Sequence, residues 1–434
     1  MFYSFHHKLL YKIGNLLNII ILVPHPDSIG NAAEEIFFAT LKAKREKKKL
    51  AIIFCKKIPF QSFFFKNLNF YDKDYFCLNS KHFLFKHNSF FQKFWSLIFI
   101  LFFVTEKIIH SFATKIFSFK KSGYYWRPMS GQDIIWRPSI HSSKFDTESF
   151  KKQDWNSQFK DKLDIDIEKK VDLECRNVFK NLGFENKWFV CLHVRDRGYR
   201  GDFDNPFNSN IENYLLSIKE IINRGGLVFR LGDTSMIRLP KIDGLIDYPF
   251  TKYKSPKMDN YLIKNCKFYL GTTSGPMDSA NFIYRKKLLL VNVSYYMVGL
   301  PFNENSLCIF RHAYSKSMKK YLSIKEMLLA YEELQLPLWI SNDWDMKENN
   351  EIEILEAVKE MLNDKKDSNA TNLQVNFRSH YFEACNYLVK HFNFNNNELE
   401  NCNEWYRWAP RMFNWHGEVS KSFLENNWDI NSRN

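Results

Sequence analysis

Residues 188–205 read WFVCLHVRDRGYRGDFDN, and this stretch decides the fold. It opens with a short apolar run that stops at His193 and gives way to Arg195 and a glycine-containing loop. Such a run predicts a buried strand of a parallel sheet, and open α/β sheets bind ligands at the carboxyl ends of their strands. His193 and Arg195 alternate with Val194, so both should point to one side, where together they suit an anion such as phosphate.

Further strands are predicted downstream, at residues 227–231, 268–270 and 288–293. The first of them ends near Asp233, and the second runs into the loop Gly271-Thr272-Thr273-Ser274-Gly275-Pro276 ahead of a predicted helix. Backbone N–H groups, hydroxyls and a helix start favour anion binding, although no Gly-Lys-Ser/Thr triplet makes this loop a P-loop. Because parallel strands end at one edge, these residues should lie beside the end of the first strand. The alternative is ordinary turn and capping chemistry.

The first 54 residues predict a βαβ unit, with strands at 18–23 and 50–54 and a helix at 31–45. The glycine pattern of dinucleotide-binding folds is missing, so no such cofactor is expected. The residues that follow the first strand face the ligand side of its sheet. Candidates for an acceptor cleft are therefore His25, Asp27, Asn31 and Glu34. The local alternative is that Asp27 or Ser28 caps the helix and that Glu34 favours its first turn.

The chain is basic: Lys plus Arg number 62 and Asp plus Glu 48, a formal net charge of +14. This balance favours nucleotides, nucleic acid, acidic glycans or an anionic membrane as partners, although a lysine-rich genome would also produce it. The eight cysteines form no C-x-x-C pair, which gives no indication of a zinc site and favours a reducing, cytoplasmic setting. No apolar run reaches the ~20 residues of a membrane-spanning helix.

Residues 59–122 are aromatic and basic, and their longest apolar run is 94–104. They predict helices of the first domain, but a segment lying on an anionic membrane or a nucleic-acid-binding patch would have the same composition. Residues 124–145 hold Trp126-Arg127-Pro128 and Trp136-Arg137-Pro138 in a loop that we expect at the border of the cleft.

Capping patterns and helical periodicity predict further helices in the second half of the chain. Ser209 with Glu212 and Ser323 with Glu326 predict capping boxes at helix starts. Residues 351–363 predict an exposed helix, and the aromatic segment that closes the chain predicts helices that pack on the rest. The domains expected are 1–150, Rossmann-like; 151–335, Rossmann-like; and 336–434, a helical extension.

A metal site is not expected. Asp202-Phe203-Asp204 could hold a metal on a diphosphate, but this three-residue match is short, and Arg197 and Arg200 nearby could neutralise both acids. Arg195 and its neighbours would then supply the positive charge in place of a metal.

Several of these residues together resemble a known family of enzymes. His193-Val194-Arg195 after an apolar strand, a strand ending in Asp233, and Tyr269-Leu270-Gly271-Thr272-Thr273-Ser274 before a helix with Ala280 resemble the donor half of fucosyltransferase-like glycosyltransferases. The chain is also similar, over more of its length, to a bacterial glycosyltransferase family of surface-polysaccharide loci. There the matching residues are Ile29-Gly30, Glu35 and the closing 419–424. The strong match covers residues 188–293.

This resemblance implies a metal-independent enzyme of the GT-B fold, in which two Rossmann-like domains face a cleft. It implies that Arg195 contacts the donor diphosphate, that His193 supports it, and that the loop residues hold phosphate or ribose. The implied donor-binding set is His193, Arg195, Asp233, Thr272, Thr273, Ser274 and Gly275. Fucosyltransferases often carry two adjacent acids after the middle strand, whereas Thr234 follows Asp233 here. This departure argues against GDP-fucose as the donor, although another GDP-linked sugar remains a candidate.

The sequence therefore predicts a hexosyl- or fucosyl-type glycosyltransferase that moves a sugar from a nucleotide-diphosphate sugar to a glycan or lipid-linked glycan. No cofactor is expected, and the place would be the cytoplasm or the inner face of its membrane. The catalytic residues expected are Arg195, Asp196 and Glu34, and Asp202 and His25 are further candidates for the general base. The alternatives are a nucleic-acid-binding protein using its basic, aromatic first half and a non-catalytic scaffold on a membrane surface.

Overall fold

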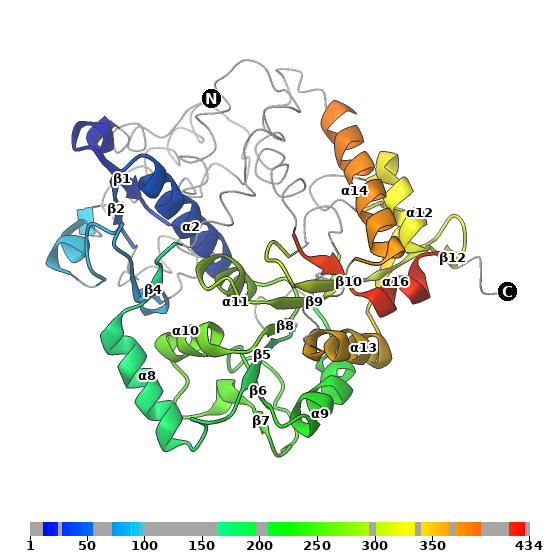
Figure 1. Cartoon of the computed structure of the whole chain (residues 1–434), viewed down its shortest axis with the longest axis horizontal. Coiled ribbons are helices and arrows are strands. Elements are labelled where there is room, and N and C mark those ends of the chain that lie inside the picture. Colours follow the sequence, from blue (N-terminus) through cyan, green and yellow to red (C-terminus); the bar gives the residue numbers. More distant parts are fainter. Residues whose placement is uncertain are drawn as a thin grey trace, which may run out of the picture.

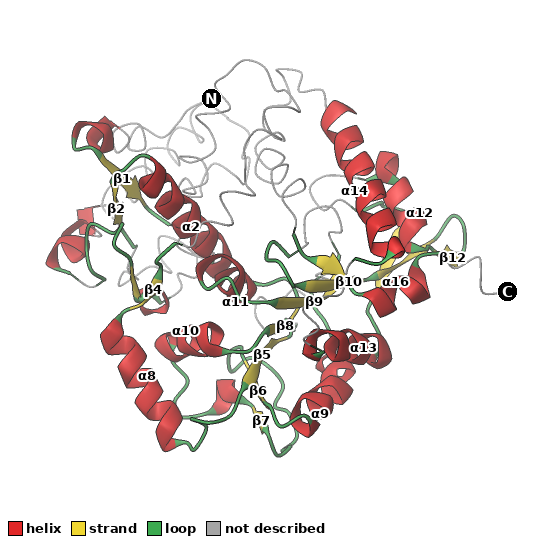
Figure 2. Cartoon of the chain, in the orientation of Figure 1, coloured by secondary structure: helices red, strands yellow, loops and turns green. Residues whose placement is uncertain are grey.

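The computed structural model describes residues 12–24, 28–54, 72–87, 89–95, 97–98, 163–196, 207–294, 301–334, 340–363, 370–391 and 416–429. These residues form a mixed α/β structure around one large sheet (Figure 1). Helices pack on both faces of that sheet, and loops gather at the ends of its strands (Figure 2). Among the described residues, no helix combines the length and the apolar character needed to cross a membrane.

The large sheet has seven strands in the order β14-β10-β9-β8-β5-β6-β7, and every pair of neighbours is parallel. In that order, the strands are Glu418–Val419, Leu307–Phe310, Leu288–Val293, Tyr269–Gly271, Phe189–His193, Leu227–Arg230 and Leu245–Ile246. The parallel sheet predicted from the sequence is thus confirmed, with β5 between β8 and β6.

The apolar run of β5 is explained by its place in the sheet. All five of its residues are buried, because helices cover both faces. The helices α8 (Lys169–Asn181), α10 (Pro256–Asn265) and α11 (Gly275–Asp278) lie on one face, and α9 (Leu215–Asn223) and α13 (Glu351–Leu362) lie on the other (Figure 1). A π-helical turn, η4 (Ser279–Ile283), continues α11.

The predicted βαβ unit is confirmed. It consists of β1 (Ile19–Leu22), α2 (Ile29–Arg45) and β2 (Lys49–Ile52), and its strands pair in parallel. The Ser28 side chain accepts from the backbone N–H of Asn31, so Ser28 caps α2. Phe37 and Phe38 of α2 contact Phe282 of η4, which joins this unit to the larger sheet.

A second connection passes through the short helix η1 (Lys73–Phe76) and β3 (Leu78–Asn79), which pairs antiparallel with β4 (Asp166–Ile167). One apolar core extends from Ile20 in β1 through β5 to Leu424 in α16 (Lys421–Asn427). The domain boundaries at 150 and 335 stay a prediction.

The C-terminal segment differs from the helical extension predicted. It includes the helices α14 (Asn372–His391) and α16, but β14 adds an edge strand to the sheet through pairing of Val419 with Cys308. Another strand of this segment, β13 (Trp344–Lys347), pairs antiparallel with β11 (His312–Ser315). Strand β14 was not predicted from the sequence, because it has only two residues, lies next to a helix, and is extended because it pairs with β10.

Two local predictions were wrong and one is confirmed. Helix α13 is not exposed, because Ile354, Val358 and other residues of one face are buried. Asn210, not Ser209, caps the short helix η2 (Ile211–Tyr214), since the hydroxyl of Ser209 donates to Glu348 instead. The capping box at the start of α12 (Ile324–Leu329) is present as predicted.

Candidate functional site

The ends of β5 and β8 are joined by hydrogen bonds that continue beyond both strands. His193 lies opposite Gly271 in the register of the pair. The backbone N–H of Thr272 donates to the carbonyl of His193 over 3.1 Å, and the backbone N–H of Arg195 donates to the Thr272 hydroxyl over 3.2 Å. His193, Arg195 and Thr272 are therefore neighbours, as the sequence predicted from strand ends alone.

Gly271 makes this close approach of two backbones achievable. A Cβ atom at this position would lie 2.0 Å from the carbonyl oxygen of His193, far inside van der Waals contact. Any side chain would push β8 away from β5 at the point where the two strands present their polar residues. The glycine thus keeps Thr272 within hydrogen-bond distance of the residues after β5.

His193 is a buried, neutral imidazole. It is 8% exposed, and burial lowers its pKa to about 4. Asp233 acts in the opposite direction, whereas Arg195 and Arg230 lower the pKa further. At neutral pH this side chain therefore brings hydrogen-bonding atoms but no positive charge to the sheet edge. Its Nδ1 has no hydrogen-bond partner within the described part of the chain.

Arg195 is the cation of this edge that the sequence singled out. Its side chain is half-buried, and its guanidinium carbon lies 5.5 Å from the centroid of the Phe207 ring. The segment that begins at residue 207 is held against Arg195, because the backbone N–H of Ser209 donates to the Arg195 carbonyl over 2.8 Å. The carboxylate of Glu348 in turn accepts from the Ser209 hydroxyl over 2.8 Å. The backbone of Arg195 is thus held from both sides.

The remaining predicted donor residues surround this point with varied roles. Asp233 is half-buried and accepts from the backbone N–H of Ser235 over 2.8 Å, so one carboxylate oxygen stabilises its own turn. The hydroxyl of Ser274 lies 3.1 Å from that of Tyr269 and does not cap α11. Thr273 and Gly275 are partly exposed at the start of the helix. They leave backbone groups near the surface of the edge.

The N-terminal unit meets this edge at a pair of glycines. A Cβ atom at Gly275 would lie 3.2 Å from the backbone nitrogen of Gly30, so the first turns of α2 and α11 touch. Glu34 lies one turn further along α2 and is only 1% exposed. Asp196, directly after Arg195, is half-buried. Of these two predicted catalytic acids, Asp196 is the one that a substrate can approach in this conformation.

Sequence reasoning missed a buried polar network at the ends of β9 and β10. Arg311 follows β10, is 5% exposed, and donates to the backbone carbonyl of Asn208. Asn292 and Asn349 exchange side-chain and backbone hydrogen bonds of 2.6 and 3.0 Å. Arg311 carried a signal, since it ends an apolar strand in the same way as His193 does. The asparagine pair carried none, because its members are distant in the sequence.

Several predicted site residues fall outside the described residues. These are His25, Asp27, Arg197, Arg200, Asp202, Asp204 and both Trp-Arg-Pro elements. The proposals about the acceptor cleft and the Asp-x-Asp element therefore stay predictions.

Comparisons with known proteins add little to this geometry. No protein-family model matches the sequence, and no curated protein matches it significantly. Among solved structures, the chain is similar to the glycosyl transferase family 9 protein from Veillonella parvula DSM 2008. The sequence identity is 11%, the TM-score is 0.40, and the alignment covers 79% of this chain and 97% of that one. A likeness at this TM-score does not establish a common fold, so conclusions about function depend on the residues of the sheet edge.

Proposed function

We propose that this protein is a glycosyltransferase that moves a sugar from a nucleotide-diphosphate sugar to a glycan acceptor. The observation that supports the proposal best is the meeting of Arg195, Thr272 and the buried imidazole of His193 at the carboxyl edge of a parallel sheet. Ligands of open α/β sheets bind at this edge. One guanidinium beside hydroxyls and backbone N–H groups has the chemistry to bind a diphosphate.

In this proposal, Arg195 neutralises the negative charge that develops on the leaving diphosphate. The resemblance to metal-independent glycosyltransferases suggests that a cation of the chain does this without a metal. Because His193 is neutral, it would orient a phosphate or sugar oxygen by hydrogen bonding and would not attract it by charge. Thr273, Ser274 and Gly275 would add hydroxyl and backbone N–H donors from the neighbouring strand end.

The acceptor would approach from the side of the N-terminal unit, where the first turn of α2 touches α11 at Gly30 and Gly275. The general base that takes the proton of the acceptor hydroxyl must touch it. The partial exposure of Asp196 makes it our first choice over Glu34, which is buried.

We place the reaction in surface-polysaccharide synthesis, at the inner face of the cytoplasmic membrane. The support is the resemblance to glycosyltransferases of surface-polysaccharide loci, together with exposed apolar side chains in and beside residues 94–104. In the described part of this region, Phe90, Phe94 and Leu97 are 76%, 48% and 60% exposed. Apolar side chains beside lysines are typical of segments that lie on anionic membranes.

Nucleotide-sugar turnover tests this proposal. Purified full-length protein is incubated with UDP-, GDP-, dTDP- and CMP-linked sugars and an oligosaccharide or lipid-linked acceptor mixture, and release of the nucleotide is measured. We expect turnover of at least one donor, and a roughly 100-fold loss in Arg195→Ala. Arg176→Ala is the control, because Arg176 is an exposed arginine of α8 that pairs with Asp172. Turnover that Arg195→Ala leaves unchanged would overturn the assignment.

A further inference from the structure

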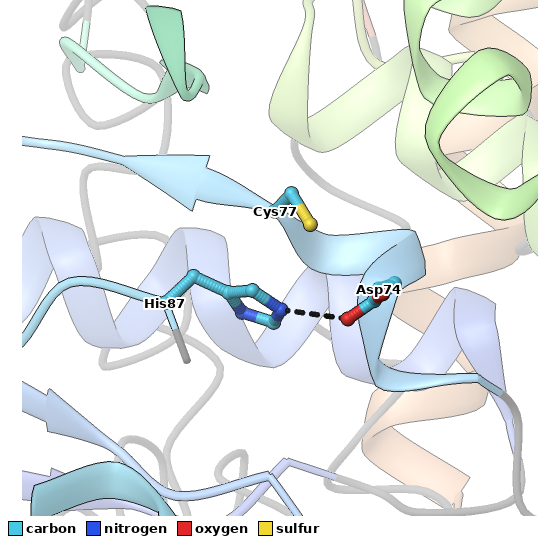
Figure 3. A group of neighbouring side chains, drawn as sticks. All are labelled: Asp74, Cys77 and His87. Carbon is cyan, nitrogen blue, oxygen red and sulfur yellow. Dashed lines mark hydrogen bonds and ion pairs between the residues drawn. The ribbon is translucent and has the colours of Figure 1, made fainter. Parts of the chain in front are cut away.

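Three potential metal ligands meet at one point in the segment 72–87, which follows the N-terminal βαβ unit in the chain. They are the carboxylate of Asp74, the thiol of Cys77 and the imidazole of His87, and one ligand atom of each lies within 4.8 Å of the others. Figure 3 shows the three side chains directed toward one another. The sequence offered no C-x-x-C signal here, because the cluster combines three residue types and spans two segments of chain.

The backbone holds two of these residues in register. Asp74 lies in η1, and Cys77 is the residue that directly follows the last residue of this helix. The two are three residues apart, about one turn of a 3-10 helix, and their ligand atoms lie within 4.8 Å of each other. The side chain of Asp72 caps η1 by accepting from the backbone N–H of Asp74 over 2.9 Å. Aspartate and thiol are thus presented together before any ion arrives.

His87 comes from a separate segment that is equally well fixed. The backbone N–H of Leu84 donates to the Leu50 carbonyl of β2 over 2.8 Å, which anchors the chain just before the histidine. The imidazole packs edge-on against Phe54 at 5.6 Å, and its side chain is only 1% exposed. The carboxylate of Glu168 accepts from the backbone N–H of His87 and adds negative charge beside the cluster.

The separation of His87 and Asp74 suits a small, tetrahedral ion. His87 Nε2 lies 3.3 Å from Asp74 Oδ1, close to the ~3.4 Å between two ligands of zinc bound at about 2.1 Å each. His87 Nδ1 has no hydrogen-bond partner among the described residues. An opposing contact is Lys73, whose Nζ lies 3.4 Å from Asp74 Oδ1. The Lys73 side chain is 21% exposed, so a cation that binds here must displace this ammonium group from Asp74.

We propose that Asp74, Cys77 and His87 bind a zinc ion, with water in the fourth position. A thiolate, an imidazole and a carboxylate form a donor set that favours Zn²⁺ over Mg²⁺ or Ca²⁺. On binding, the S–H bond of Cys77 breaks, a Zn–S bond forms, and one proton leaves to solvent. The ion would tie η1 to the segment of His87. η1 already contacts η4 through Tyr75, whose hydroxyl donates to Ser279 over 3.2 Å.

Cobalt substitution tests this site directly. Full-length protein is stripped with a chelator and titrated with Co²⁺, and thiolate-to-cobalt charge-transfer absorbance is recorded. We expect a band that saturates at one ion per chain, disappears when Zn²⁺ is added, and persists in excess Mg²⁺. The band should be lost in Cys77→Ala and retained in Cys175→Ala, since Cys175 is another buried thiol and is not part of the cluster.

Asp74→Asn keeps the test decisive if removing the buried thiol unfolds the chain, because the Asp74 side chain is 35% exposed and the amide preserves its shape. We expect affinity for Zn²⁺ to fall at least about tenfold, the loss that even removal of a ligand's partner can cause. His82→Gln is its control, since His82 faces Asp164 at 3.6 Å and lies outside the cluster. No cobalt band in the native chain, a band that persists in Cys77→Ala, or unchanged affinity in Asp74→Asn would each overturn the proposal.

Discussion

Two buried histidines of this molecule show how surrounding charge selects a ligand. His87 and His193 are each 8% exposed, and burial lowers the pKa of both. Each also has an Nδ1 without a hydrogen-bond partner among the described residues. Yet the groups around them differ. His87 faces a carboxylate and a thiol, whereas His193 lies near one carboxylate, that of Asp233, and two arginines.

The difference shows that burial makes both imidazoles neutral and that their neighbours then decide their chemistry. Beside Asp74 and Cys77, a neutral imidazole completes a set of donors for a cation. Beside Arg195 at a strand end, it accompanies positive charge that favours an anion. At this edge the positive charge therefore comes from Arg195, and His193 contributes hydrogen-bonding atoms, because burial removes the charge of the imidazole.

Gly271→Ala should disrupt the region of His193 most strongly and leave that of His87 intact. The new Cβ would lie 2.0 Å from the His193 carbonyl oxygen, so β5 and β8 must separate. We expect the free energy of unfolding to fall by about 3 kcal/mol, measured by denaturant unfolding. Gly183→Ala is the control, because nothing lies within 4 Å of its new Cβ and only its φ of +75° opposes the change. There the expected loss is about 1 kcal/mol.

Unchanged stability of Gly271→Ala would show that β5 and β8 do not approach as closely as described. Cobalt binding at the cluster of His87 provides the second readout. We expect it to be unaffected wherever the Gly271→Ala protein remains folded, because the two regions share no residue.

His193→Gln should reduce the sensitivity of the protein to acid. The pKa of His193 is about 4 in the folded chain and ~6.5 when unfolded, so below pH 6.5 the unfolded state binds more protons. Its contribution to stability is therefore complete above pH 6.5 and is lost as the pH falls toward 4. Between pH 7.5 and 5, this amounts to about 2 kcal/mol. We expect the variant to lose about 2 kcal/mol less over that range, and equal losses in both proteins would contradict the neutral assignment.

Thr272→Val should have the smallest effect. It removes the hydroxyl that accepts from the Arg195 backbone N–H, a hydrogen bond worth about 1 kcal/mol. We expect the Kd for a nucleoside diphosphate to rise roughly fivefold, measured by calorimetry. Thr272→Ser keeps the hydroxyl and should bind as the native chain does. An equal Kd for the Thr272→Val and Thr272→Ser proteins would indicate that this hydrogen bond does not position Arg195 for the ligand.

The sequence predicted those features that depend on local patterns. The run that ends at His193 identified a buried parallel strand, because residues buried on both faces must be apolar. The rule that parallel strands end at one edge of a sheet then predicted that Thr272 lies beside Arg195, and the hydrogen bond between them agrees with this. The βαβ unit at the N-terminus was found by the same reasoning.

Other features depend on contacts that no local pattern reveals. The pairing of Asn292 with Asn349 joins residues 57 positions apart, and the cluster of His87 is completed only when that residue approaches η1. Strand β14 is too short for an alternating pattern and exists because β10 offers it an edge. Burial of Glu34, which limits its use as a base, likewise follows from how α2 packs.

The measurement that tests the central claim most directly is the affinity for a diphosphate group at the sheet edge. Binding of nucleoside diphosphates and of the matching uncharged nucleosides is compared by calorimetry in the native chain, Arg195→Ala and Arg176→Ala. We predict that Arg195→Ala weakens diphosphate binding at least tenfold, about 1.4 kcal/mol, and leaves nucleoside binding unchanged, while Arg176→Ala matches the native chain. Equal diphosphate affinity in Arg195→Ala and the native chain would contradict the account.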